Sequence, residues 1–210
     1  MNQPLRFLLL LPLLALARQP AAAQTAEEKL QAKARAIHEQ AFTVDSHEDT
    51  PSQSLLKPGF DLTKDHVGTT EGQVDFPKMK RGGLDAAFWV VYVGQGPRTA
   101  AGYAAIRQEV QAQFDAIAAA VRKHPAELAL ATTPAEALRI RKAGQRAVFI
   151  GIENGYTIGR DLGLLQTYYN QGVRYLTLCH SSNNDLCDSS TDPNGPEYQG
   201  LSPLGRQSVQ

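Results

Sequence analysis

The chain has 210 residues, 42% of them hydrophobic, and its 21 basic residues balance its 21 acidic residues. This balance gives no electrostatic reason to expect nucleic acid or an anionic lipid surface as a partner. The two cysteines, Cys179 and Cys187, are too few for a disulfide scaffold, and they could form one bridge or remain two buried thiols.

The first 23 residues are predicted to be a secretory signal peptide. A short basic segment ends at Arg6, an apolar run covers residues 7–17, and alanines occupy positions 21–23. The run is shorter than the about 20 apolar residues of a membrane span and contains Pro12, so no membrane span is expected. We expect cleavage after Ala23 and export to the periplasm or the medium. The mature chain would then carry 19 basic and 21 acidic residues, a net charge of −2.

A helix, a strand and a polar loop are predicted to follow. Residues 25–41 combine strong helix formers with apolar residues near helical spacing. Residues 42–47, FTVDSH, have the character of a short strand, and residues 50–72 form a loop rich in Pro, Gly, Ser and Thr.

Three further strands alternate with helices along the rest of the chain. Each strand is an apolar run bounded by turn residues, which is typical of strands buried on both faces. The helices show apolar residues at helical spacing or a capping Thr, Pro at the first turn and Gly at the end. The predicted strands are 84–93, 146–153 and 173–180, and the predicted helices are 74–83, 99–123, 133–144, 160–172 and one that begins at Ser202.

This alternation predicts an α/β protein with a parallel sheet, either an open doubly wound sheet or a (β/α)8 TIM-like barrel. No Gly-rich phosphate loop follows the first strand, and several strands end in reactive side chains, so we favour the barrel. Such a barrel needs about 250 residues. We therefore expect residues 24–210 to be the N-terminal part of one catalytic barrel domain, with about its first four strands.

Two side chains at the end of the first predicted strand are candidate metal ligands. His47 and Asp49 are two residues apart, and this spacing places side chains on the same face of a strand. An imidazole and a carboxylate that converge in this way suit a zinc-like divalent ion. A structural hydrogen bond between the two is the alternative.

The ends of two later strands carry reactive side chains as well. Glu153 follows the run AVFIGI, and His180 follows YLTLC. Because the C-terminal ends of parallel strands meet at one edge of a barrel, both should lie near His47 and Asp49. A carboxylate has two oxygens, so Glu153 could bridge two metal ions about 3.5–4 Å apart.

Four motifs together resemble the membrane (renal) dipeptidase family of zinc peptidases. They are VDSHEDTP, GIENG, GVRYLTLCHSSNNDLCDSS and GLSPLG, and they follow one another in the family's order and spacing from about Phe42 onward. The resemblance implies a (β/α)8 TIM-like barrel of the metal-dependent hydrolase type, which hydrolyses dipeptides with a hydroxide held between two Zn²⁺ ions.

The resemblance also assigns roles to residues of this chain. His47 and Asp49 would bind one zinc, Glu153 would bridge both, and His180 would be the catalytic contact to the substrate near its scissile carbonyl. Tyr156 and Asp188 stand at positions on the expected substrate side. The family's two later histidines and proton-shuttling aspartate would lie beyond Gln210, so this chain alone is expected to be inactive.

The substrate class, the catalytic competence of the chain and its oligomeric state stay open at this point. The same site could open other amides or lactams, or the chain could be an inactive fragment or binding module. The expected partners are small dipeptide substrates, with a homodimer as an open alternative and no nucleic acid.

Overall fold

The computed structural model describes residues 24–70 and 72–210, so the predicted signal peptide lies outside the described residues. The chain divides into two compact units, residues 1–37 and 38–210. Most of helix α1 (Ala26–Gln40) belongs to the first unit, and this helix has no buried residue. All the other elements belong to the second unit. None of the helices in the described part of the chain is both long enough and apolar enough to cross a membrane.

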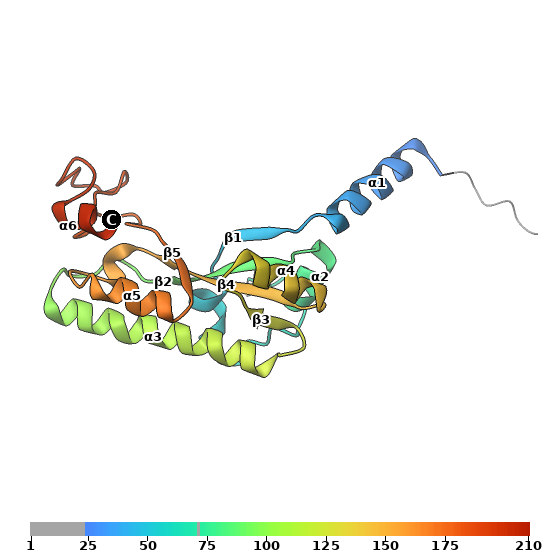
Figure 1. The fold of residues 1–210 in the computed structure, drawn as a ribbon, viewed down its shortest axis with the longest axis horizontal. Helices are drawn as coiled ribbons and strands as arrows, with labels where there is room; N and C mark the ends of the chain where they lie inside the picture. The colour runs from blue at the N-terminus through green and yellow to red at the C-terminus, as the bar shows by residue number, and fades with distance from the viewer. Residues whose placement is uncertain (1–23, 71) are drawn as a thin grey trace, which may run out of the picture. The chain divides into compact units, whose positions relative to one another are not determined.

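The second unit is built on a five-stranded parallel sheet (Figure 1). Strand β2 pairs with β1 on one side and with β4 on the other. The second edge of β4 is shared, because β3 pairs with residues 146–148 and β5 with residues 150–152. The strands are β1 (Val44–Glu48), β2 (Ala86–Tyr92), β3 (Leu128–Leu130), β4 (Arg146–Glu153) and β5 (Val173–Leu176).

The parallel α/β class is confirmed, but the predicted number of strands is wrong by one. Strand β3 was missed because it has three residues, too few to show an alternating pattern, and it pairs with only the start of β4. The four predicted strands form the series β1, β2, β4 and β5. Strand β5 ends at Leu176, although the Thr177 amide still donates to the Ile152 carbonyl.

Four helices of the second unit, but not α5, begin at a residue whose side chain caps them. Thr99, Thr133 and Ser202 each accept a hydrogen bond from a first-turn amide, and Thr133 forms a capping box with Glu136. Asp75 caps a helix that was not predicted to have a cap. The helices of the second unit are α2 (Phe76–Gly82), α3 (Ala100–Lys123), α4 (Pro134–Lys142), α5 (Gly163–Asn170) and α6 (Pro203–Ser208), with a π-helical turn at Pro51–Leu55 and a 3-10 turn at Gly155–Thr157.

The core lies on both faces of the central strands. One face of β2, with Trp89 and Val91, packs in the same cluster as Phe114 and Ile117 of α3. On the opposite face, Ala86 of β2 packs with residues of α4 and β4. This two-sided burial explains why the strand is nearly continuous in apolar residues.

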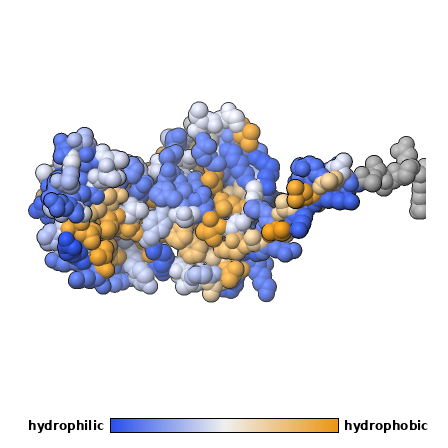
Figure 2. Space-filling view, turned by 90° about the horizontal axis from the view of Figure 1, so that it is seen from above, coloured by the Kyte–Doolittle hydropathy of each residue, from blue (hydrophilic) through white to orange (hydrophobic). Residues whose placement is uncertain are grey.

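Some apolar surface of the second unit is exposed. Val44 of β1 and Leu130 of β3 are 46% and 44% exposed, and Figure 2 shows hydrophobic areas bordered by hydrophilic residues on one face. Among the described residues, β1 and β5 each leave one edge unpaired, so the sheet is open. All five strands point the same way, which brings the C-terminal ends of β1, β2, β4 and β5 to one end of the sheet.

Candidate metal centre

Three of the predicted site residues converge at this end of the sheet. His47 Nε2 lies 3.4 Å from Asp49 Oδ1 and 3.4 Å from Glu153 Oε2. One potential ligand atom from each of the three residues lies within 4.8 Å of the other two. Residues from two non-adjacent strands, β1 and β4, therefore meet across the end of β2.

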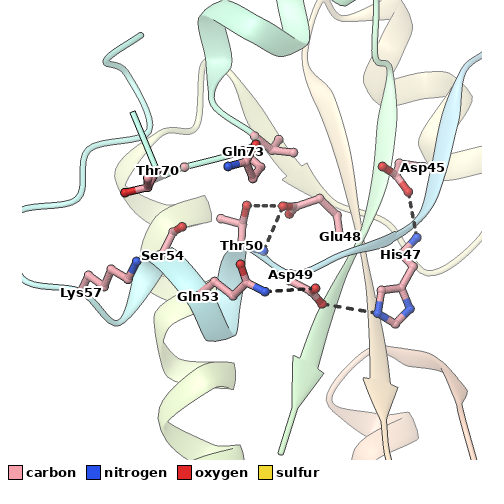
Figure 3. Close-up of a pocket in the computed structure, with 12 residues that line it drawn as sticks. Asp45, His47, Glu48, Asp49, Thr50, Gln53, Ser54, Lys57, Thr70 and Gln73 are labelled. Atoms are coloured by element: carbon pink, nitrogen blue, oxygen red, sulfur yellow. Dashed lines mark hydrogen bonds and ion pairs between the residues drawn. The ribbon is translucent and has the colours of Figure 1, made fainter. Parts of the chain in front are cut away.

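The end of β1 is shaped by an irregularity that the sequence did not reveal. Asp45 pairs with Ala87 and Glu48 with Trp89, so β1 has one more residue than β2 over this interval. The His47 amide donates to Asp45 Oδ1 at 2.9 Å, which holds the bulged segment. Beyond the strand end, Gln53 Nε2 donates to Asp49 Oδ2 at 3.3 Å, and Figure 3 shows this contact beside the His47 ring. Gln53 thus leaves Oδ1 as the oxygen that faces His47.

Tyr175 of β5 holds the other side of the His47 ring. Its hydroxyl lies 3.1 Å from His47 Nδ1, and the two rings are stacked with their centroids 6.3 Å apart. Gly151 makes room for this tyrosine, because a Cβ at position 151 would lie 2.4 Å from the Tyr175 ring. With Nδ1 engaged by Tyr175, His47 turns Nε2 toward the two carboxylates.

His180 faces the second oxygen of Glu153. Its Nε2 lies 3.6 Å from Glu153 Oε1, and its Nδ1 lies 3.4 Å from the hydroxyl of Tyr92. Tyr92 is the last residue of β2 and pairs directly with Glu153 in the sheet. The two oxygens of Glu153 therefore face two different histidines, each of which contacts a tyrosine through Nδ1.

Both tyrosines remain neutral near pH 7. Burial, followed by the negative charges of Glu153 and Asp49, raises the pKa of Tyr175 to about 12. The same causes raise the pKa of Tyr92. Each phenol therefore keeps its proton and can either donate a hydrogen bond to a histidine or accept one.

Asn154 ties together the strand ends that carry these side chains. Its backbone has φ +81°, a conformation that Asn tolerates better than most residues. Its amide nitrogen Nδ2 donates to the Val93 carbonyl after β2, and its backbone N–H donates to Thr177 Oγ1 after β5. Its Oδ1 accepts from Asn184 Nδ2. This buried residue fixes the position of the preceding Glu153.

A second carboxyl, that of Glu48, lies on the other side of the β1 end. It is buried, and this burial raises its pKa to about 7 although Thr50 donates to Oε1 through both N and Oγ1. Glu48 lines a cavity of about 240 Å³ that His47 and Asp49 also border (Figure 3). Sequence reasoning gave Glu48 no role.

The donor set fits a divalent metal ion. One imidazole nitrogen and two carboxylates are ligands that zinc accepts. The buried Asp49 Oδ1 has no hydrogen-bond donor in the part of the chain that the structure describes. A buried carboxylate oxygen without a donor is unfavourable unless a cation or a water molecule satisfies it.

Two of the three predicted substrate contacts, Tyr156 and Asp188, have their hydrogen-bond partners outside this cluster. Tyr156 is 1% exposed and its hydroxyl donates to the Pro97 carbonyl, so its side chain is part of the core. The Asp188 carboxylate accepts backbone N–H groups of Glu197, Tyr198 and Gly200, which lowers its pKa. In this structure both side chains stabilise the scaffold, and a contact with substrate stays a prediction.

Sequence reasoning missed Tyr175, Tyr92, Gln53 and Asn154. The sequence did carry a signal for Tyr175. Gly151 and Glu153 lie two residues apart on one face of β4, and a glycine at that place leaves space for a large neighbouring side chain. The bulge that positions His47 has no signal of this kind.

Curated relatives of the chain are dipeptidases. The chain is 36% identical over 126 residues to dipeptidase ataJ of Aspergillus terreus, covering 58% of this chain and 30% of that protein. It is 31% identical over 169 residues to dipeptidase verJ of Clonostachys rogersoniana, covering 76% of this chain and 42% of that protein. The chain thus spans less than half the length of these relatives.

Solved structures share the fold. The probable dipeptidase PvdM from Pseudomonas aeruginosa superposes with a TM-score of 0.76 at 27% identity, covering 86% of this chain and 46% of that one. A metallo peptidase from Rhodobacter sphaeroides, liganded with a phosphinate mimic of the dipeptide L-Ala-D-Ala, gives a TM-score of 0.64 at 22% identity and covers 80% of this chain and 54% of that one. The family profile of membrane dipeptidase (peptidase family M19) matches residues 31–210. The chain therefore belongs to the membrane dipeptidase family, peptidase family M19.

Proposed function

We propose that this chain forms part of a zinc-dependent dipeptidase. The observation that carries the proposal is the position of Glu153, whose two oxygens face His47 and His180 while Asp49 completes a three-ligand cluster. Family membership and the dipeptide mimic bound to a structural neighbour support the substrate class.

His47, Asp49 and Glu153 are the residues that would hold the metal. A zinc ion bound there would supply a hydroxide nucleophile near neutral pH and polarise the substrate carbonyl. For His47 to offer the Nε2 lone pair, its proton must lie on Nδ1, where the Tyr175 oxygen can accept it. Tyr175 would thus fix the tautomer that binds metal.

His180 would carry the opposite tautomer. If the Tyr92 hydroxyl donates to His180 Nδ1, the histidine keeps its proton on Nε2, the atom that faces Glu153. This N–H can donate to the carbonyl oxygen of a dipeptide as negative charge develops on it. His180 would thereby stabilise the transition state without binding metal.

The second metal ion is a further part of the proposal. Glu153 would also help to hold this ion, since its carboxylate has a second oxygen besides the one that faces His47. Its remaining ligands are expected from a later part of the protein, as the family resemblance implies. Two ions bridged by one carboxylate would suit attack by hydroxide on a peptide carbonyl.

The test of this function uses the complete gene product, reconstituted with zinc after chelation. We expect hydrolysis of a panel of dipeptides, and much slower hydrolysis of N-acylated amino acids and lactams. Turnover of the acylated compounds or lactams in preference to dipeptides would show that the protein is a related metallohydrolase and not a dipeptidase. No turnover of any compound, with zinc bound, would refute a catalytic role.

We also propose that the protein is exported, on the basis of the signal sequence in residues 1–23. N-terminal sequencing of protein from the extracytoplasmic fraction should begin at Gln24. Mature protein that still begins at Met1 would contradict export by cleavage.

A further inference from the structure

Two cysteines flank the segment that follows β5 and includes His180. Cys179 is half-buried and Cys187 is buried, and both are unbridged in this structure. The Cys179 thiol donates to the Asp188 carbonyl at 3.3 Å, so its sulfur lies against the residue next to Cys187. The Cys179 thiol is also near enough to Cys187 to contribute, after burial, to raising the pKa of that thiol. The sequence separates them by a loop of nine residues, counted from Cys179 to Cys187.

The loop between them is held in place by a buried asparagine. Asn184 Oδ1 accepts the amide N–H groups of Leu186 and Cys187 at 2.8 and 3.2 Å. The Asn184 backbone N–H donates to the Cys187 carbonyl, and its Nδ2 donates to the Leu178 carbonyl just before Cys179. Cys187 also forms an isolated antiparallel bridge with Leu201. Asn184 therefore binds the backbone beside both cysteines and holds the two ends of this loop close together.

We propose that Cys179 and Cys187 form a reversible disulfide that clamps the segment carrying His180. The Cys179 sulfur already lies 3.3 Å from the carbonyl of the residue that follows Cys187, and Asn184 holds the backbone beside both cysteines, so the loop has a geometry from which a bridge can form. The proposal is independent of the metal site and of dipeptide hydrolysis. The sequence left open whether the two cysteines form a bridge or remain thiols. Under this proposal both forms occur, as the oxidised and the reduced state of one site.

The oxidant would be a disulfide compound of low molecular mass, such as oxidised glutathione. The Cys179 thiolate attacks one glutathione sulfur, which forms a mixed disulfide and releases one reduced glutathione. The Cys187 thiolate then attacks the Cys179 sulfur and releases the second reduced glutathione. The two cysteines lose two protons and two electrons, and the electrons reduce the glutathione disulfide.

The order of attack follows from exposure. Cys179 is reached first because it is only half-buried, whereas Cys187 is buried. Burial, followed by the neighbouring Cys179, raises the pKa of Cys187 to about 12, so Cys187 reacts slowly with external reagents. Once Cys179 carries the mixed disulfide, the neighbouring Cys187 attacks it within the same molecule at high effective concentration.

The bridge would restrict the chain immediately after β5. Closing a short loop removes conformational entropy from the unfolded chain. The disulfide would also tie the His180 segment to Cys187, which is paired with Leu201 in an isolated antiparallel β-bridge. We expect the midpoint of thermal unfolding to rise by roughly 5 °C on oxidation.

The experiment compares reduced protein with protein equilibrated in oxidised glutathione, both free of metal. Blocking of free thiols followed by peptide mass analysis should find Cys179 linked to Cys187 within one molecule, together with the higher midpoint. Cys187→Ser should instead retain glutathione on Cys179, and Cys179→Ser should gain little glutathione and no increase in midpoint. The double variant Cys179→Ser/Cys187→Ser controls for oxidation elsewhere and should not respond.

Three outcomes would overturn the proposal. They are separate glutathione adducts on both cysteines, a bridge between two molecules, or an internal bridge that leaves the midpoint unchanged. Because none of these measurements uses zinc or a peptide substrate, failure here would leave the proposed dipeptidase function untouched.

Discussion

At the scale of single residues, Glu153 lies between the two histidines of the candidate site, and we expect metal binding to depend most on the negative charge of its carboxylate. We predict that Glu153→Gln will lose bound zinc and activity together, because a neutral amide is a poor ligand for two cations that need anionic oxygen. Metal analysis and dipeptide turnover of the complete protein check this. Glu127→Gln, at an exposed position, serves as the matched control. Full zinc content with near-normal turnover would reduce Glu153 to a structural carboxylate.

His180 is predicted to act on the substrate and not on the metal. His180→Ala in the complete protein should lower kcat on the order of 100-fold, with zinc content and fold intact, because one hydrogen bond to the developing oxyanion is removed. Kinetics and metal analysis of the same preparation separate the alternatives. Loss of zinc would make His180 a ligand, and an unchanged kcat with lower stability would leave it a packed strand-end residue.

Tyr175 should tune zinc affinity through His47. Tyr175→Phe keeps the stacked ring but removes the hydroxyl 3.1 Å from His47 Nδ1, and such a loss behind a metal ligand typically weakens binding about 10- to 100-fold. Competition with a chromophoric chelator measures the affinity directly. Tyr169→Phe is the control, because that ring is exposed and stacks on Arg174. Equal zinc affinity in both variants would show that the Tyr175 contact has no part in metal binding.

At the scale of elements, β4 illustrates how backbone and site depend on each other. Gly151→Ala would place a Cβ 2.4 Å from the Tyr175 ring, which packs against both Phe88 and His47 and cannot move freely. We predict a loss of stability of about 1–3 kcal/mol, together with weaker zinc binding because Tyr175 is displaced. Gly94→Ala is the control, since nothing lies within 4 Å of a Cβ there. Denaturant unfolding and chelator competition measure the two effects, and an unaffected zinc affinity would separate Gly151 from the site.

The elements that sequence reasoning predicted correctly are those with a strong local signal. The apolar runs of β2 and β4 and the capped helix α4 are visible in the chain itself, because burial on two faces and capping both depend on neighbouring residues. Strand β3 was not predicted, since its pairing with the start of β4 is set by tertiary contacts. At the site, the meeting of His47 with Glu153 followed from the parallel sheet.

The contacts that orient the site depend on long-range geometry and could not be predicted in the same way. The Tyr175 hydroxyl reaches His47 only because β5 lies against the second half of β4 and Gly151 leaves space there. The bulge in β1 appears only when its register with β2 is known. Strand ends therefore predict which residues meet, whereas side-chain orientation requires the folded structure.

At the scale of the whole molecule, the candidate metal site joins strands that are not neighbours in the sheet. His47 and Asp49 come from the end of β1 and Glu153 from the end of β4, with β2 between them. A cation bound by all three binds the folded chain much better than the unfolded one, so it should stabilise the fold by mass action. Without it, the like charges of Asp49 and Glu153 face one another across His47.

We therefore predict that zinc raises the thermal midpoint of the chelated protein. At a free zinc concentration 100 times the dissociation constant, linkage gives about 2.7 kcal/mol. This corresponds to a rise of roughly 5–10 °C for a chain of this size. Thermal unfolding of the Cys179→Ser/Cys187→Ser variant, with and without zinc, excludes metal binding by the thiols, and Glu153→Gln in that background should show little rise. An equal rise in both proteins would mean that the stabilising zinc binds elsewhere, because only the first retains the carboxylate that links β4 to β1.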